Sequence, residues 1–344
     1  MLRRTPRHPR PLAATVATVS VVALTISACG GGNSAKQLPT ISGAGATFPA
    51  AAYQGWAGEY ARSTGNRVNY QSVGSGAGVR QFLAGTVDFG ASDEALSAEE
   101  FSSGKAAQRG AVQIPMLGGT VTPAYNNPAC PGLKLTQAQL ADIFLGKIRD
   151  WKALGCPDRP LTVVHRSDGS GTTKAFTRSL SCFSNEWKDK VGEGKSVPWP
   201  VGIGGKGNEG VAATIANTPG TIGYVNQAYV RGPVQAAALQ NRAGNFVTAD
   251  ARSGAAGLNG VVLDERLGGE DCNPAGAESF PIVAFTWILA YEKGQGAAKA
   301  EAVRSFLTWA LGEAPQKQAE GLGFVPLKGA VLTKARAAVA KIVD

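Results

Sequence analysis

Short apolar runs alternate along most of the chain with segments whose apolar positions recur every three or four residues. The apolar runs predict β-strands at 67–73, 87–92, 110–125, 161–166, 221–226 and 280–291. Helical spacing occurs at 51–65, 78–85, 135–146, 171–180, 208–220 and 297–313. Such alternation predicts an α/β fold, and 344 residues are enough for two lobes of about 150 residues each. Residues 249–278 are small, polar and irregular, so we expect loops there.

Residues 1–28 have the layout of a secretory signal peptide. Four arginines precede an apolar run at 12–25, which is too short to span a bilayer comfortably. The run ends in "ISAC", which resembles a bacterial lipobox and predicts a lipidated Cys29 followed by a flexible tether over 29–37. An ordinary signal with an incidental cysteine, or an uncleaved anchor, are the alternatives. We therefore expect an extracytoplasmic protein, lipid-anchored to the outer face of the bacterial cytoplasmic membrane.

Charge and cysteine content narrow the class of protein further. Without the four signal arginines, 30 basic residues face 25 acidic ones, a net charge of +5. This mild excess contains no basic run, so nucleic acid is not an expected partner. Four cysteines remain after Cys29, an even set that allows two disulfides in three connectivities.

We predict one particular disulfide pairing, in which both bonds lie within the second lobe. Cys130 paired with Cys156 would close a loop around 135–151, and Cys182 paired with Cys272 would tie a helix end to the irregular segment. Histidine is nearly absent and no ligand cluster is visible, so neither a metal nor another cofactor is expected.

Four turns rich in glycine, serine and threonine follow a predicted strand or open a predicted helix, at 43–50, 73–79, 89–97 and 166–173. Backbone N–H groups at a helix N-terminus are unpaired donors with partial positive charge, and glycine lets an anion approach them. Each turn alone is equally explained as an ordinary helix N-cap. Four such turns in one α/β chain favour an anion site.

Five blocks of the sequence, at 41–97, 143–151, 163–180, 199–215 and 219–225, occur in an order found in a known family. Their motifs include "GATFP", "VGSGAG", "GASDE" and "RSDGSGT". Together they make the chain resemble the periplasmic phosphate-binding proteins of bacterial phosphate-specific ABC transporters. The similarity runs from about residue 41 to the C-terminus and is loosest at 236–278 and around the cysteines.

The resemblance implies a two-lobed type II periplasmic-binding-protein fold with a ligand cleft between the lobes. Lobe one would comprise 38–121 and 284–344, and lobe two 122–283. The implied function is extracytoplasmic capture of inorganic phosphate and its delivery to the membrane permease subunits, by a monomer that is not an enzyme. The family's phosphate contacts fall on Thr47, Phe48, Ser75, Asp93, Arg166, Ser170, Gly171 and Thr172, and Asp168 matches the residue that pairs with the binding arginine.

The residue types agree with this assignment. Arg166 can offer a bidentate fork, hydroxyl and backbone groups can donate, and Asp93 can accept a proton carried by phosphate but not by sulfate. Asp168 could instead cap the following helix, and Asp93 could cap the turn after it. Asn208 is an expected N-cap in "GGKGNEG", where Lys206 could also approach the ligand. His165 stands where many relatives carry a second basic residue, which would weaken the local positive potential.

Two other classes of function are alternatives to phosphate binding for transport. In an exported hydrolase or phosphatase, Ser170 would be the nucleophile, but "DGSGT" is not G-x-S-x-G and His165 is the only histidine outside the signal segment. A regulatory or adhesive surface lipoprotein on the same scaffold is the other alternative. Capture of the permease would separate it from a transport protein.

Overall fold

The computed structural model describes residues 37–344 of the chain. Its strands are β1 (Ile41–Gly45), β2 (Val68–Ser72), β3 (Phe89–Ser92), β4 (Ala111–Asn126), β5 (Lys134–Leu135), β6 (Thr162–Arg166), β7 (Ile203–Gly205), β8 (Thr221–Asn226), β9 (Gln235–Ala236), β10 (Ala238–Gln240), β11 (Phe246–Val247) and β12 (Val283–Tyr291). A nine-stranded sheet has the order β2-β1-β3-β12-β4-β8-β6-β7, with β9 also paired to β4. A three-stranded sheet has the order β11-β10-β5.

Helices cover both halves of the large sheet. The α-helices are α1 (Ala50–Thr64), α2 (Ser75–Ala84), α3 (Ala98–Phe101), α4 (Gly104–Arg109), α5 (Gln137–Phe144), α6 (Gly171–Phe183), α7 (Asn185–Lys190), α8 (Gly207–Asn217), α9 (Ala251–Leu258), α10 (Ala297–Ala310), α11 (Glu313–Gly321) and α12 (Gly329–Val339). Two short 3₁₀ helices are η1 (Trp151–Leu154) and η2 (Gln227–Tyr229). The predicted α/β class is therefore confirmed.

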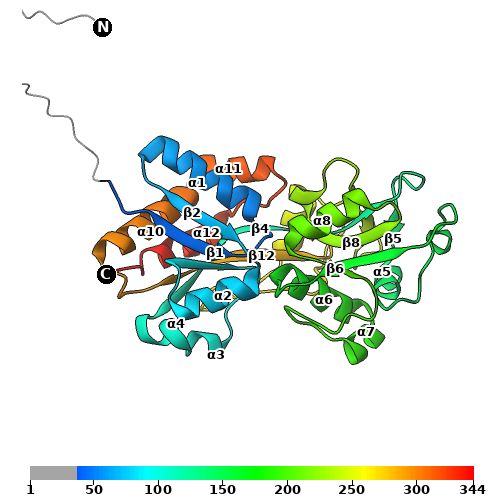
Figure 1. The fold of residues 1–344 in the computed structure, drawn as a ribbon, viewed down its shortest axis with the longest axis horizontal. Coiled ribbons are helices and arrows are strands. Elements are labelled where there is room, and N and C mark those ends of the chain that lie inside the picture. The colour runs from blue at the N-terminus through cyan, green and yellow to red at the C-terminus, as the bar shows by residue number, and fades with distance from the viewer. Residues whose placement is uncertain (1–36) are drawn as a thin grey trace, which may run out of the picture. The chain divides into compact units, whose positions relative to one another are not determined.

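The long strand β4 joins the two lobes (Figure 1). Its first part pairs with β12 as far as Thr120, and from Val121 onward it pairs with β8. We call the elements around β1–β3 and β12 lobe one, and those around β6–β8 lobe two. Because one sheet continues through both lobes, residues 37–344 form a single compact unit. The residue limits proposed for the lobes remain a prediction.

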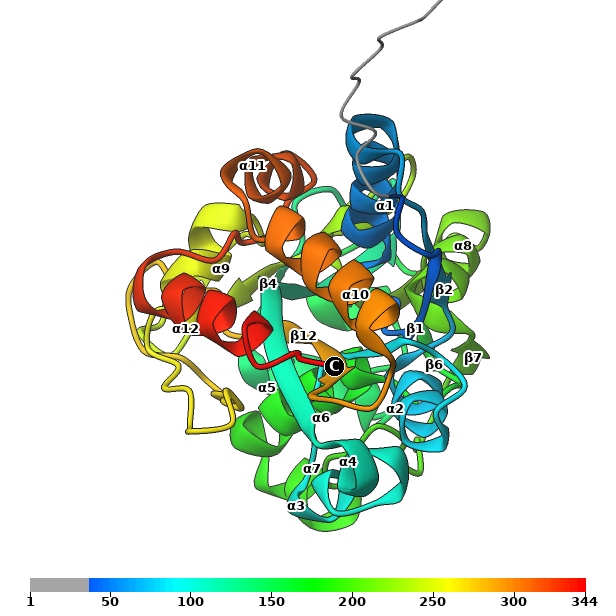
Figure 2. The same cartoon turned by 90° about the vertical axis from the view of Figure 1, so that its left-hand side faces the viewer.

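Local sequence patterns explain how the central elements form. Helix α1 buries Tyr53, Trp56 and Tyr60, which recur at helical spacing, and it ends at Gly65 in the left-handed conformation. Strand β12 is buried along its whole length between β3 and β4, and its sequence is apolar on both faces except at Thr286. Figure 2 shows α10, α11 and α12 gathered at the outer end of lobe one.

Two features of the chain differ from the sequence-based expectations. The segment Ile41–Gly45 was not predicted as a strand, because "ISGAG" is rich in small residues, yet it lies buried between β2 and β3. Part of the expected loop at 249–278 is helix α9, which begins with a capping box between Asp250 and Ser253. The remainder of that segment lacks regular structure apart from short turns.

The structure contains the predicted disulfides, Cys130–Cys156 and Cys182–Cys272, with Cα–Cα distances of 5.4 and 6.1 Å. The second bond joins the last turn of α6 to the irregular segment that precedes β12. Just before Cys272, the carbonyl of Leu267 accepts a hydrogen bond of 2.8 Å from the indole of Trp287 in β12. This segment therefore contacts both lobes.

Candidate anion-binding site

The predicted site residues lie where strands end and helices begin. Thr47 and Phe48 connect β1 to α1, Ser75 is the first residue of α2, and Asp93 directly follows β3. In lobe two, Arg166 is the last residue of β6. Asp168 and Ser170 occupy the turn before α6, whose first two residues are Gly171 and Thr172. Sites for anions are common at such strand-to-helix junctions, where the helix N–H groups are unpaired.

Residues from both lobes meet at Asp93. The hydroxyls of Ser75 and Thr172 each lie 3.4 Å from Asp93 Oδ2, although the two residues are far apart in the sequence. A Cβ atom added to Gly171 would lie 2.8 Å from Ser75 Oγ, so only glycine fits at this point of the α6 N-terminus. Apart from the partly exposed Asp168, the predicted residues are all buried.

Arg166 and Asp168 form a bidentate ion pair. Arg166 Nε donates to Asp168 Oδ1 at 2.7 Å and Nη2 donates to Oδ2 at 2.6 Å. Burial alone would raise the pKa of Asp168, but donation from Arg166 and from the backbone N–H of Gly207 holds it below its usual value. The remaining nitrogen, Arg166 Nη1, is buried without a partner among residues 37–344. The guanidinium is thus oriented by Asp168 with one donor left for a ligand.

Unused backbone donors surround the same point. The N–H groups of Phe48, Ser75 and Gly171 donate no hydrogen bond to any acceptor in the described part of the chain. Each belongs to a junction between a strand and a helix, where the N–H groups carry partial positive charge. Together with Arg166 Nη1, they make the site rich in donors and suited to an anion.

Asp93 is the exception in this donor-rich site. Burial raises the pKa of its carboxyl group to about 7, although Arg166 and nearby hydroxyls counteract part of that effect. Its Oδ1 atom is buried without a partner in the described structure. A ligand that supplies acceptor oxygens to Arg166 Nη1 and a proton to Asp93 Oδ2, which lies beside the hydroxyls of Ser75 and Thr172, would satisfy both groups at once.

The alternative capping roles are decided by the geometry. In the turn after Asp93, Glu94 N donates to Ser92 Oγ at 3.1 Å, and helix α3 is capped by Ser97, so Asp93 supplies neither cap. Helix α6 is capped by Ser170, whose Oγ accepts from Thr173 N at 3.0 Å. Asp168 is therefore free of that task and pairs with Arg166.

Asn208 does not cap α8, contrary to the expectation from the sequence. The N-cap of α8 is Lys206, which is exposed, whereas Asn208 lies buried in the first turn. Asn208 Nδ2 donates to Thr47 Oγ1 at 2.7 Å and to Thr172 Oγ1 at 3.1 Å. The expected cap is thus a bridge between the lobes, which no local pattern could reveal.

Two tyrosines that sequence reasoning missed also organise the site. Tyr224 stacks on Phe176 and places its hydroxyl 2.7 Å from Thr173 Oγ1, where it also accepts from the N–H of Arg166. Tyr229 donates to the carbonyl of Thr47 at 2.6 Å, across the two lobes. Both come from segments that carry no glycine-rich motif, so only folding brings them here.

His165 does not face the ligand position. Its ring stacks on Trp199, with ring centroids 4.9 Å apart and planes 12° apart, and its Nδ1 lies 3.1 Å from the carbonyl oxygen of Arg166. The His165 side chain therefore takes part in packing on lobe two. No hydrogen bond joins His165 to Ser170 among residues 37–344, as a base and nucleophile pair would require.

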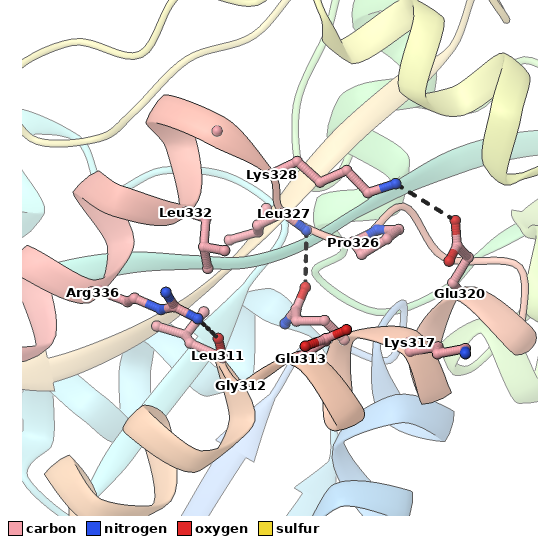
Figure 3. Close-up of a pocket in the computed structure, with 12 residues that line it drawn as sticks. Leu311, Gly312, Glu313, Lys317, Glu320, Pro326, Leu327, Lys328, Leu332 and Arg336 are labelled. Atoms are coloured by element: carbon pink, nitrogen blue, oxygen red, sulfur yellow. Dashed lines mark hydrogen bonds and ion pairs between the residues drawn. The ribbon is translucent and has the colours of Figure 1, made fainter.

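A separate groove of about 470 Å³ lies between α11 and α12, away from these residues (Figure 3). Leu311, Leu327 and Leu332 form its apolar lining, and an ion pair between Lys328 and Glu320 crosses its rim at 3.8 Å. Arg336 donates to the carbonyl of Leu311 at 2.8 Å. None of the predicted anion-site residues lines this groove.

Residues 37–344 contain no helix that is both long and apolar enough to cross a membrane. In the same residues, no three side chains of histidine, cysteine, aspartate or glutamate are grouped as metal ligands would be. The predicted signal peptide and Cys29 lie outside the described residues.

Comparison with known proteins identifies the family. A model of the PBP superfamily domain matches residues 30–314. Phosphate-binding protein PstS of Pasteurella multocida is 43% identical over 315 residues, which cover 88% of this chain and 90% of the relative. Phosphate-binding protein PstS of Xylella fastidiosa is 44% identical over 303 residues, which cover 83% of this chain and 81% of the relative.

A solved structure shows the same fold. The phosphate-binding protein from Stenotrophomonas maltophilia superposes with a TM-score of 0.71 at 22% identity, covering 87% of this chain and 93% of that one. The two-lobed fold expected from the sequence is therefore confirmed. On the strength of these matches, the chain belongs to the PstS family of phosphate-binding proteins within the PBP superfamily.

Proposed function

We propose that this protein captures inorganic phosphate in the site built around Arg166 and Asp93. The observation that carries the proposal is that Arg166 Nη1 is buried and unpaired within the described residues, while Asp93 Oδ2 has only long contacts of 3.4 Å to the hydroxyls of Ser75 and Thr172. Hydrogen phosphate offers acceptor oxygens to the arginine and to the helix N–H groups, and its proton can be donated to the carboxylate. The relatives' names, which state phosphate binding, support the same ligand.

The predicted contact set follows from this proposal. Asp93 would accept a hydrogen bond from the protonated oxygen of phosphate, and Asp168 would orient the guanidinium. The other phosphate oxygens would accept hydrogen bonds from Thr47, Phe48, Ser75, Arg166, Ser170, Gly171 and Thr172. Ser170 can fill this role while it caps α6, because its hydroxyl accepts from Thr173 N and keeps its own proton to donate.

Isothermal titration with phosphate, arsenate and sulfate tests the ligand. Phosphate and arsenate both carry a proton near neutral pH, so both should bind, whereas sulfate should bind far more weakly. Equal affinity for sulfate and phosphate would refute the role of Asp93, and no binding of any of the three would refute the proposed function.

Delivery to an ABC permease is the second part of the proposal. A structural neighbour from Clostridium perfringens is described as a putative phosphate ABC transporter substrate-binding protein, which supports this context. Reconstituted permease subunits should bind the phosphate-loaded protein and import phosphate only when it is present. Import at the same rate without it would contradict this part.

The anchoring and the oligomeric state are also proposals. We infer that the mature protein begins at a lipidated Cys29, is tethered by 29–37 outside the cytoplasmic membrane, and acts as a monomer. Mass spectrometry of the native N-terminus should find a diacylglyceryl-modified cysteine, and native mass spectrometry of the lipid-free domain should give one subunit. An unmodified N-terminus beyond residue 29 in native membranes would rule out the lipid anchor.

A further inference from the structure

Two buried hydroxyls behind Asp93 have no assigned role. Tyr53 lies in α1 and Thr286 lies in β12, and both are almost completely buried. Tyr53 OH, Thr286 Oγ1 and Asp93 Oδ1 each lack a hydrogen-bond partner of acceptable geometry in the part of the chain that the structure describes. Buried polar atoms are rarely left unpaired, so three of them around one point require an explanation.

The sheet register brings Thr286 beside Asp93. Strands β12 and β3 are antiparallel, and their pairing ends with Trp287 opposite Ser92. Thr286 and Asp93 are the next residues along the two segments, so both lie at this end of the pair. Burial raises the pKa values of Asp93 and of Tyr53, and the Thr286 hydroxyl counteracts both shifts.

The direction of the hydrogen bonds follows from the chemistry of the three groups. Because burial raises the pKa of Tyr53, its phenol keeps its proton and can donate to Thr286 Oγ1. The Thr286 hydroxyl can donate one hydrogen bond, and an ionised Asp93 carboxylate can only accept. Asp93 Oδ2 lies beside the hydroxyls of Ser75 and Thr172 on the ligand side, which leaves Oδ1 for Thr286.

We propose that Thr286, supported by Tyr53, is a positioning residue that stabilises ionised Asp93 and keeps Oδ2 turned toward the ligand as an acceptor. The chain of donors runs from Tyr53 to Thr286 to Asp93 Oδ1, and each bond polarises the next. Because an acceptor at this position selects anions that carry a proton, Thr286 controls the discrimination between phosphate and sulfate. This selectivity role rests on the proposed phosphate function, whereas the effect on Asp93 does not.

The other groups that face Asp93 leave this role open to Thr286. Arg166 approaches from β6 as a cation, with Asp168 on its far side. Tyr70 of β2 and Tyr229 of η2 donate to the carbonyls of Ala46 and Thr47, and burial raises the pKa of both phenols, so both stay neutral. Replacing Thr286 changes no charge around Asp93 and removes one donor.

The decisive experiment is an NMR pH titration of the Asp93 side-chain carboxyl in the ligand-free protein, with Asp93→Asn used to assign the signal. The wild-type midpoint should lie at about 7. Thr286→Val keeps the shape and removes the hydroxyl, and it should raise the midpoint by about one pH unit, the effect of losing one donor to a charged group. Thr286→Ser should titrate like the wild type, and Tyr53→Phe should shift the midpoint in the same direction by less.

Selectivity provides the second readout. At pH 7 a more protonated Asp93 can donate to sulfate, so Thr286→Val should narrow the phosphate-over-sulfate preference about tenfold, in proportion to the shifted midpoint. Thr221→Val is the matched control, because this buried threonine donates within its own turn to the carbonyl of Thr218. It should change neither readout.

Two results would overturn the inference: an unchanged midpoint in Thr286→Val, or an equal shift in Thr286→Ser, which would point to packing instead of the hydroxyl. The titration needs no phosphate, so it stands apart from the proposed function. If the wild type did not bind phosphate, the proposed function and the selectivity role would both fall, while a shifted Asp93 midpoint would still establish the hydrogen bond from Thr286.

Discussion

Replacing Arg166 by alanine removes the one side chain whose positive charge meets the proposed anion directly. The guanidinium is buried, with its side chain only 1% exposed, and two of its three nitrogens are held by Asp168. The third, Nη1, is unpaired within the described residues and available to the ligand. The substitution therefore removes a ligand contact and also leaves Asp168 as an uncompensated carboxylate near the site.

The structure sets the size of the expected effect. Removing one partner of a buried, hydrogen-bonded charge pair costs about 2–5 kcal/mol of binding free energy. At about 1.4 kcal/mol per factor of ten, the lower limit corresponds to a loss of affinity of roughly 30-fold. Part of this loss comes from repulsion by Asp168, so Arg166→Ala combined with Asp168→Ala should bind phosphate more tightly than Arg166→Ala alone.

Isothermal titration with phosphate measures these affinities, and thermal unfolding checks that each variant is folded. Arg252→Ala is the control, because Arg252 forms an exposed ion pair with Glu278 and should not affect binding. If Arg166→Ala binds phosphate within a factor of three of the wild type, the site is misplaced.

Three further predictions concern selectivity, closure and stability. Asp93→Asn should narrow the phosphate-over-sulfate preference, most clearly at pH values above 7 where the wild-type carboxyl is ionised, because an amide can donate to either anion. Competition titration that leaves the preference intact would argue against the role of Asp93. Tyr229→Phe removes the 2.6 Å hydrogen bond to Thr47 across the lobes, so phosphate should dissociate roughly fivefold faster in stopped-flow measurements. An unchanged dissociation rate would show that this bond does not hold the lobes together. Replacing Cys182 and Cys272 together by serine should lower the free energy of unfolding by about 4 kcal/mol, because the disulfide between them closes a long loop. An unchanged midpoint of urea unfolding would contradict this prediction.

Much of the fold follows from local sequence patterns. The predicted strand at 221–226 coincides with β8, and the predicted helices at 51–65 and 171–180 lie within one residue of α1 or inside α6. These segments succeed because apolar periodicity and glycine caps act over a few residues, which is the range over which they specify backbone conformation. Strand β1 escaped detection because its burial comes from its neighbours β2 and β3, not from its own side chains.

The sequence by itself determined which turns could hold an anion, since strand ends rich in glycine and hydroxyl residues place unpaired N–H groups at helix starts. Only the tertiary structure decided that Asn208 bridges Thr47 and Thr172 and that Thr286 lies beside Asp93. Asn208 and Thr47 are 161 positions apart, and their hydrogen bond depends on how the two lobes approach each other. Local propensity contains no information on such contacts, because side-chain donors at these distances are brought together by packing of the whole sheet.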